Sequence, residues 1–152
     1  MFMSAHTSVG LWLTTKITNP LLAFVIGFAM HFFLDMIPHG DSNFDNHKSD
    51  KKEQRKFEMK VGVIDFIFSV IIVYSFITSS INYNMYVLLA ALIGSWLPDW
   101  IWIAADFFHI KFMDWYIKLH AKVHNVIGYD FTAFYGVALQ LLVTILFISL
   151  VF

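Results

Sequence analysis

The fold is decided by one stretch, residues 20–40, which reads PLLAFVIGFAMHFFLDMIPHG. It opens as an apolar run and ends among groups that can bind a metal ion or transfer a proton: His31, Asp35, His39 and, just beyond the stretch, Asp41. A carboxylate and imidazoles are costly in an apolar environment unless they have partners. The stretch therefore predicts a membrane helix with a functional site at its end.

The composition of the chain points to the same setting. Of 152 residues, 59% are hydrophobic and 14% are charged, which is far from the average of a soluble domain. We expect a single membrane-embedded domain over residues 1–152. The formal net charge of -1 argues against a nucleic-acid partner, because phosphate binding needs a surplus of Lys and Arg. The sequence has no cysteine, which excludes disulfides and thiolate metal sites.

Hydropathy predicts an all-α fold, a polytopic membrane helical bundle of four to five membrane helices plus an interfacial amphipathic helix. About 20 apolar residues are needed to cross a hydrocarbon core of about 30 Å. The runs that meet this need are residues 20–37, 61–81, 83–105 and 131–152. A shorter run over residues 4–17, with Ser4 as its candidate cap, is either a fifth membrane helix or a re-entrant one, and we favour a helix.

Two polar segments, residues 41–60 and 106–128, interrupt the apolar runs on one side of the predicted bundle. The first is rich in lysine and is expected to be a solvated loop or a surface helix. The second mixes lysines with aromatic residues at helical spacing, which favours an interfacial helix. By the positive-inside rule, we expect a multi-pass protein of the cell (inner) membrane with its basic loops in the cytoplasm. The N-terminus lacks the basic start of a signal peptide, so we expect it to be retained.

Polar residues of the predicted spans fall on this same side. His31 and Asp35 have i, i+4 spacing, which places them one turn apart on a helix face. His120 and His124 form a second such pair. We expect both pairs to bind one or two divalent metal ions together with further ligands: His6, His39, Asp65 and Asp99. Imidazole and carboxylate donors suit Zn²⁺, Mn²⁺ or Fe²⁺, and Zn²⁺ is favoured.

Some of these residues have other interpretations. Asp65 is close enough in sequence to pair with Lys60, and His6 can simply cap the N-terminal helix. Asp41 and His39 are the candidate general bases, because neither lies inside a span and both can face a water molecule at the metal. Asp41 is the residue to which we assign the catalytic role.

The same residues carry a resemblance to the YdjM-like family of small inner-membrane metal-dependent hydrolases. Residues 4–7, SAHT, resemble its N-terminal Thr-His start, and residues 94–99, GSWLPD, resemble its Gly-x-x-Leu-Pro-Asp element. Residues 27–35, GFAMHFFLD, are similar to its Gly-x-x-x-His-x-x-x-Asp helix, and residues 120–125, HAKVHN, to its paired-His helix. The resemblance implies a multi-pass helical fold, a divalent metal and hydrolase activity.

The chain also departs from that family. The His-x-x-x-Asp helix comes first here, whereas in the family it usually follows the other two elements. Leu-Pro-Asp continues as Trp100 in place of the expected second Asp and His. Residues 38–41, PHGD, have a looser similarity to zinc-dependent phospholipase C type sites, where His and Asp ligands hold clustered zinc.

These observations lead to one expected function and two alternatives. We expect a membrane-bound hydrolase of a lipid-linked or membrane-proximal phosphoester, with membrane lipid as a partner and a lipid-like substrate presented from the leaflet. A metal or proton transporter can use the same residues as a transit site, but it should carry polar groups across the membrane depth. A structural membrane protein whose metal pins the helices is the third interpretation.

Overall fold

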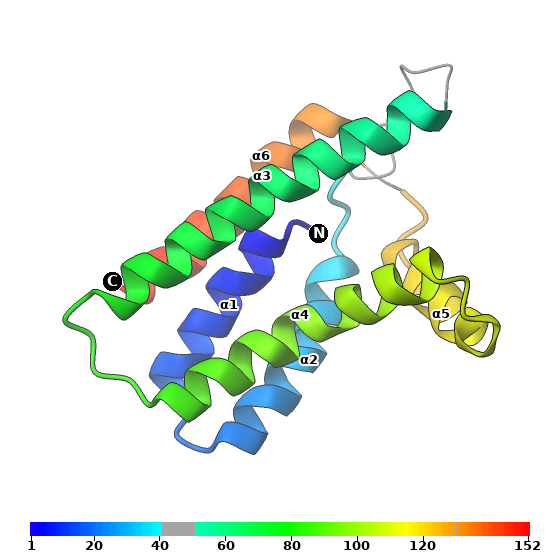
Figure 1. Cartoon of the computed structure of the whole chain (residues 1–152). Helices are drawn as coiled ribbons and strands as arrows, with labels where there is room; N and C mark the ends of the chain where they lie inside the picture. Colours follow the sequence, from blue (N-terminus) through cyan, green and yellow to red (C-terminus); the bar gives the residue numbers. More distant parts are fainter. Residues whose placement is uncertain (41–50, 130) are drawn as a thin grey trace.

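The structure is a computed structural model that describes residues 1–40, 51–129 and 131–152. The elements follow in the order α1 (Met3–Lys16), α2 (Pro20–Asp35), α3 (Lys51–Ile77), α4 (Met85–Phe107), the 3-10 helix η2 (Lys111–Met113), α5 (Asp114–His124) and α6 (Ala133–Ser149). These described ranges contain no strand, so the predicted all-α class is confirmed. Figure 1 shows α1 with α3 and α6 on one side and α2 and α4 on the other.

Helix α1 is the central element of the fold. It packs against α2, α3, α4 and α6, and 10 of its 14 residues are buried. Its hydroxyl groups tolerate burial because they bond to carbonyls of their own helix. Thr7 Oγ1 donates to Met3 O at 2.7 Å, and Thr14 Oγ1 donates to Gly10 O at 2.9 Å. The run expected as a fifth membrane helix is therefore a helix, and other helices enclose it.

Capping residues fix the start of α2. The Asn19 side chain accepts a hydrogen bond from the Leu22 N–H at 3.1 Å, and Pro20 occupies the first turn, where its missing N–H does not matter. The helix ends at Asp35, two residues before the predicted end at position 37. Pro38 explains the early end, because proline disfavours helical backbone in the residue before it.

Helix α4 begins after Asn84, whose side chain accepts from the Tyr86 N–H at 2.9 Å. The helix contains Pro98 and continues through it to Phe107. Asp99 therefore projects from a helix that remains packed on α2.

Helices α2 and α4 pack closely because glycines lie where they meet. A Cβ atom at Gly94 would collide with the carbonyl group of Phe24, and one at Gly27 would lie 2.8 Å from Ala91 O. Small residues at a helix interface let the two backbones approach one another. The close packing sets the end of α2, which carries the first predicted ligand pair, beside the middle of α4.

Two helices are long and apolar enough, by length and composition, to cross a membrane. They are α3 over Met59–Ile77 and α4 over Met85–Phe107. Helix α2 and the Phe134–Ser149 part of α6 are apolar but shorter. At about 1.5 Å per residue, the 16 residues of α2 extend about 24 Å, less than a hydrocarbon core of about 30 Å. A bundle of four to five spans thus stays a prediction.

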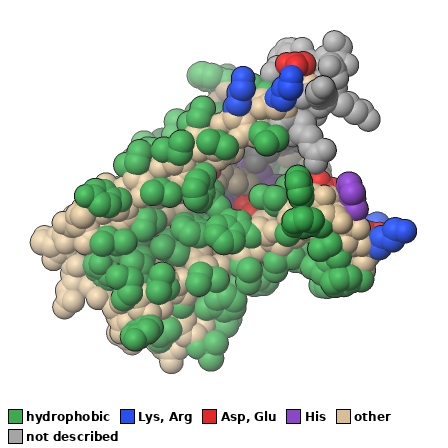
Figure 2. Space-filling model, in the orientation of Figure 1, with side chains coloured by type: hydrophobic (Ala, Val, Ile, Leu, Met, Phe, Trp, Pro, Cys, Tyr) green, Lys and Arg blue, Asp and Glu red, His purple; other side chains and the backbone are tan. Residues whose placement is uncertain are grey.

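The apolar part of α3 faces outward. Only 17% of its most apolar window is buried inside the structure, so it is unlike the core helix of a soluble protein. Exposed side chains there include Val63, Ile64, Ile67, Val70 and Ile71. Figure 2 shows hydrophobic side chains over most of the visible face of the molecule. A continuous apolar surface of this kind marks contact with lipid or with another protein.

The predicted polar segments take two forms. Residues 41–50 lie outside the described residues, whereas residues 51–60 form the first part of α3. The segment predicted as an interfacial helix contains η2 and α5. In α5, Tyr116 and His120 are buried, and Trp115 and Leu119 are exposed. The inward face of α5 thus brings the second histidine pair toward α2 and α4.

Candidate metal site

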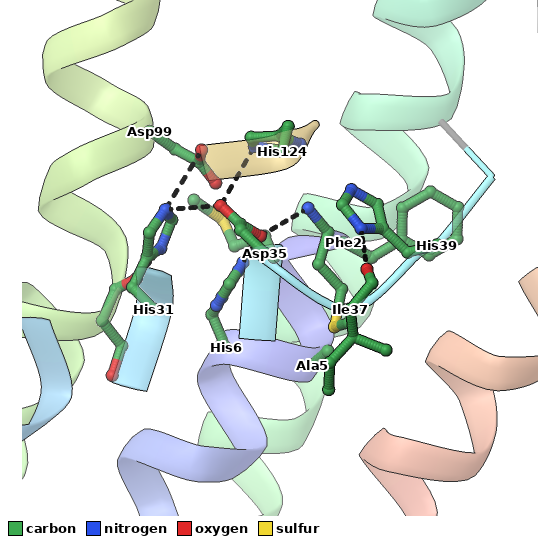
Figure 3. Close-up of polar contacts among 12 residues, drawn as sticks. Phe2, Ala5, His6, His31, Asp35, Ile37, His39, Asp99 and His124 are labelled. Atoms are coloured by element: carbon green, nitrogen blue, oxygen red, sulfur yellow. Dashed lines mark hydrogen bonds and ion pairs between the residues drawn. The ribbon is translucent and has the colours of Figure 1, made fainter. Parts of the chain in front are cut away.

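Asp35 lies at the centre of a group of histidines at the end of α2 (Figure 3). Its Oδ2 atom is 3.0 Å from His31 Nε2, 3.1 Å from His124 Nε2 and 3.8 Å from His120 Nε2. Asp99 adds a second carboxylate, with Oδ1 at 3.3 Å from His120 Nε2 and 3.6 Å from His31 Nε2. The two predicted i, i+4 pairs therefore meet, and helices α2, α4 and α5 each contribute.

The atoms that face one another in this group lack hydrogen-bond partners among the described residues. They are the buried Nε2 atoms of His31, His120 and His124 and the Oδ2 atom of Asp35. Burial of such atoms without partners costs free energy. Two donors bound to one tetrahedral ion at about 2.0–2.1 Å lie about 3.3 Å apart. The separations of 3.0 to 3.8 Å fit that geometry, so this donor set can hold a divalent cation.

The backbone of α4 orients the first imidazole. His31 Nδ1 donates to the Ser95 carbonyl oxygen at 2.8 Å, which assigns the proton to Nδ1 and the lone pair to Nε2. That lone pair points toward the two carboxylates. Histidines that bind metals commonly donate their other ring N–H to a carbonyl or carboxylate in this way. His31 is thus held in the tautomer and orientation of a ligand.

The candidate ligand atoms form two groups that share one residue. The first group is His31, Asp35, Asp99 and His120, and the second is Asp35, His39 and His124. In each group, one ligand atom per residue lies within 4.8 Å of all the others. Buried His and Asp side chains that can hold a metal ion, expected from the sequence, are therefore present.

His6 reaches the site from α1 but belongs to neither group. Its ring stacks on that of His31 at 4.1 Å between centroids, and its Nε2 is 3.3 Å from Asp35 Oδ1. The amino nitrogen of Met1 lies 2.8 Å from the same oxygen. Neither ring nitrogen of His6 has a hydrogen-bond partner in the part of the chain that the structure describes. His6 therefore faces the carboxylate oxygen opposite to the one that the other histidines approach.

The structure does not bring Asp65 into either group. Both of its carboxylate oxygens lie 3.3 Å from the Ser4 backbone N–H, in the first turn of α1. The first N–H groups of a helix have no partner within the helix and attract negative charge. Among the described residues no ion pair joins Asp65 to Lys60, the alternative that the sequence left open. Ser4 is not the N-cap either, because that position belongs to Phe2.

Helix α5 is fastened to α4 by Tyr116, whose hydroxyl donates to Pro98 O at 2.8 Å. Burial raises the pKa of Tyr116 to about 12, and the negative charges of Asp99 and Asp35 add to the shift. The phenol therefore stays protonated and keeps donating. Burial also lowers the pKa of His124 below 6.5, against the opposing effect of Asp35. At neutral pH the His124 imidazole is thus neutral, which is the form that binds metals.

The site has a solvent-facing side. The side chains of Asp99 and His124 keep 21% and 25% of their surface exposed, whereas those of His31 and Asp35 are fully buried. Figure 2 shows acidic and histidine side chains in a hollow between the upper end of α3 and α5. An ion held by these residues can therefore be reached from one side, which a catalytic site needs and a closed structural site lacks.

Sequence reasoning missed two groups that position the ligands. Gln140 of α6 donates through Nε2 to His39 O at 2.8 Å, and its presence as a polar residue in an apolar run was the available signal. The role of the Ser95 carbonyl could not be found from the sequence, because every residue carries a backbone carbonyl. Asp41, the predicted general base, lies outside the described residues.

In comparisons with known proteins, no family model, curated protein or solved structure matches the chain.

Proposed function

We propose that this protein is a membrane-embedded, metal-dependent hydrolase that acts on a phosphoester presented from the lipid surface. The observation that carries the proposal is the approach of the buried Nε2 atoms of His31, His120 and His124 to Asp35 Oδ2. When bound there, a divalent ion supplies Lewis acidity, which activates water for attack and stabilises negative charge on the phosphoryl group. Zn²⁺ suits these donors best, with Mn²⁺ or Fe²⁺ as alternatives.

The residues divide this work by position. His31, His120 and the two carboxylates hold the ion, and the Ser95 carbonyl orients His31. The partly exposed edges of Asp99 and His124 leave an approach for substrate and water. Asp41 keeps the role of general base on the sequence argument, because it lies outside the predicted span and can face a water molecule at the metal.

A membrane location for the site rests on two observations. Helices α3 and α4 are long and apolar enough to cross a membrane, and α3 exposes most of its apolar surface. Figure 2 shows basic side chains at the upper end of α3 and near α5, on either side of the hollow. By the positive-inside rule these charges favour the cytoplasmic face of a cell membrane. A site at that level favours an amphipathic phosphoester from the leaflet.

The resemblance to the YdjM-like family supports the hydrolase assignment. Its motifs include His31, Asp35, Asp99, His120 and His124, the residues that the structure brings together. The family implies a metal-dependent hydrolase, and we extend that activity to this chain as part of the proposal.

Metal content tests the first half of the proposal. Detergent-purified protein should contain zinc or another divalent ion by elemental mass spectrometry. His31→Ala and Asp35→Ala should lose this metal, because each removes a buried donor. His109→Ala is the matched control, since His109 is an exposed histidine outside both ligand groups. Wild-type protein without bound metal, or metal content unchanged in Asp35→Ala, would contradict the proposal.

Turnover tests the second half. The metal-loaded protein should hydrolyse bis(p-nitrophenyl) phosphate, p-nitrophenyl phosphate or anionic phospholipid presented in vesicles. Asp35→Asn should abolish this activity. In reconstituted vesicles, flux of the metal ion without turnover of any phosphoester would favour the transporter. Stable binding with neither flux nor turnover would favour a structural metal.

A further inference from the structure

Asp35 is shared by two groups of candidate ligands, and this arrangement carries a further inference. One oxygen, Oδ2, lies 3.0 Å from His31 Nε2 in the first group and 3.1 Å from His124 Nε2 in the second. We propose that the protein binds two divalent cations, with Asp35 as their common ligand. The inference rests on the proposed function, because it takes the first group to be a metal site.

One ion does not account for both groups. His31, Asp35, Asp99 and His120 already supply the four donors of a tetrahedral ion. His39 joins the second group and not the first. The buried Nε2 of His124 has no hydrogen-bond partner among the described residues, although its ring lies against that of His39 at 4.9 Å. A second cation beside Asp35 gives the His124 Nε2 atom a partner, and His39 belongs to the same group of candidate ligands.

The chain holds His39 in place for this role. Its Nδ1 donates to Ile37 O at 2.6 Å, which assigns the lone pair to Nε2, as in metal-ligating histidines. Figure 3 shows the His39 ring on the turn after α2, on the far side of Asp35 from His31. The carboxylate thus lies between the two sets of imidazoles.

Helix α6 supplies no ligand to either group but positions the second one. Gln140 Nε2 donates to the His39 carbonyl oxygen at 2.8 Å, and the Gln140 amide oxygen accepts the Phe2 backbone N–H. A Cβ atom at Gly136 would collide with the same His39 carbonyl group. The turn can lie against α6 only because residue 136 has no side chain. Gly136 and Gln140 are therefore positioning residues for His39.

The two positions differ in charge and in ligand number. The first position has two carboxylates and two imidazoles. The second has two imidazoles and one carboxylate, that of Asp35, which it shares with the first. The second ion should therefore bind more weakly and keep more coordination positions for water or substrate. Pairs of metal ions held about 3.5–4 Å apart stabilise both the attacking and the leaving oxygen in phosphoryl transfer. This chemistry matches the phosphoester substrate of the proposed function.

Metal stoichiometry tests the inference. Metal-free protein in detergent would be titrated with Mn²⁺ or Zn²⁺ and analysed by calorimetry and elemental mass spectrometry. Wild type should bind about two equivalents in two steps, and His39→Ala should bind about one, with the tighter step retained. Asp35→Asn should weaken both steps, and His109→Ala should match wild type. The Mn²⁺ form should show an electron paramagnetic resonance spectrum of two interacting ions, replaced in His39→Ala by that of an isolated ion.

A second variant covers the case in which His39→Ala does not fold. Gln140→Leu keeps every ligand but removes the bond to the His39 carbonyl, so it should weaken the second step and leave the first unchanged. One equivalent in wild type, unaffected by His39→Ala or Gln140→Leu, would overturn the second position and leave the first intact. No bound metal in wild type would overturn the proposed function itself.

Discussion

The His31 ring is fixed by a backbone atom of the neighbouring helix: its Nδ1 donates to the Ser95 carbonyl oxygen at 2.8 Å. Since the acceptor belongs to the main chain, the contact depends on the spacing of α2 and α4 and not on the Ser95 side chain. The glycines at the α2–α4 interface set that spacing. Helix packing and ligand orientation are therefore coupled at this point.

The substitution Gly94→Ala should disturb both the packing of α2 on α4 and the orientation of the His31 ring. The added Cβ would collide with the carbonyl group of Phe24, and a backbone group cannot swing away as a side chain can. We expect a loss of about 1–3 kcal/mol in the free energy of unfolding, typical of overpacking, together with weaker metal binding at His31. Thermal unfolding in detergent and metal titration would measure the two effects.

Gly62→Ala is the matched control for Gly94. Nothing lies within 4 Å of a Cβ atom at Gly62, which is on the open face of α3. Alanine there should leave metal binding unchanged and stabilise the helix by up to about 1 kcal/mol, from helix propensity alone. Equal destabilisation in both variants would show that the α2–α4 approach is not what fixes the site.

Asp65 should contribute to stability and not to metal binding. Its carboxylate faces the first-turn N–H of Ser4, so Asp65→Ala leaves that donor without its charged acceptor. We expect a loss of about 1 kcal/mol in unfolding free energy, as for other helix caps, and unchanged metal stoichiometry. Asp65→Asn keeps an acceptor oxygen and should therefore lose less unfolding free energy than Asp65→Ala.

Glu53→Gln provides the comparison for Asp65. Glu53 is an exposed acid on the same helix, paired with Lys56 at the surface, so its neutral variant should have almost no effect on stability. Loss of bound metal in Asp65→Asn would reinstate Asp65 as a ligand, as the sequence first predicted.

Much of the site was predictable from the spacing of its residues and from the free-energy cost of placing ionisable groups in apolar runs. The i, i+4 pairs and Asp99 were found because charged or ionisable groups in apolar runs need partners, and their predicted side of the bundle brought them to one place. The sharing of Asp35 by two groups was not predictable. It depends on the angle at which α5 and the turn after α2 approach one carboxylate, which sequence spacing does not set.

The role of α1 was only partly predictable. Its helical state followed from the sequence, which predicted either a fifth membrane helix or a re-entrant one, but its position at the buried centre of the fold did not. Thr7 and Thr14 donate hydrogen bonds to carbonyls of their own helix, so their hydroxyl groups can be buried without being left unpaired. The partner of Asp65 escaped prediction for a related reason, because it is a backbone N–H, which every residue but proline carries.

Tyr116 should stabilise the attachment of α5 in a pH-dependent way. Tyr116→Phe removes the hydroxyl that donates to Pro98 O at 2.8 Å, and we expect a loss of about 1 kcal/mol near neutral pH. The folded-state pKa of about 12 lies above the ordinary value of 10.0. The contribution is therefore full below pH 10 and is lost as the pH rises through 12.

The measurement is the difference in unfolding free energy between wild type and Tyr116→Phe from pH 7 to the alkaline limit of the protein. That difference should shrink above pH 10. Tyr74→Phe is the control, since Tyr74 is an exposed tyrosine on α3 and should show no effect at neutral pH. A difference between wild type and Tyr116→Phe that is constant across this range would contradict the assigned hydrogen bond.

The exposed face of α3 should tolerate a charge only at its end. Ile67 lies near the middle of the Met59–Ile77 segment and is 53% exposed, whereas Met59 is its first residue and is 65% exposed. If lipid covers this face, Ile67→Lys places an ammonium group in the hydrocarbon core at a cost of about 2.5–3.5 kcal/mol. Lysine at position 59 can reach the interface and should cost little. Carbonate extraction of membranes should therefore release much more Ile67→Lys protein than Met59→Lys protein. If α3 instead faced water, Ile67→Lys would leave the distribution unchanged or improve solubility, and the membrane assignment of α3 would be wrong.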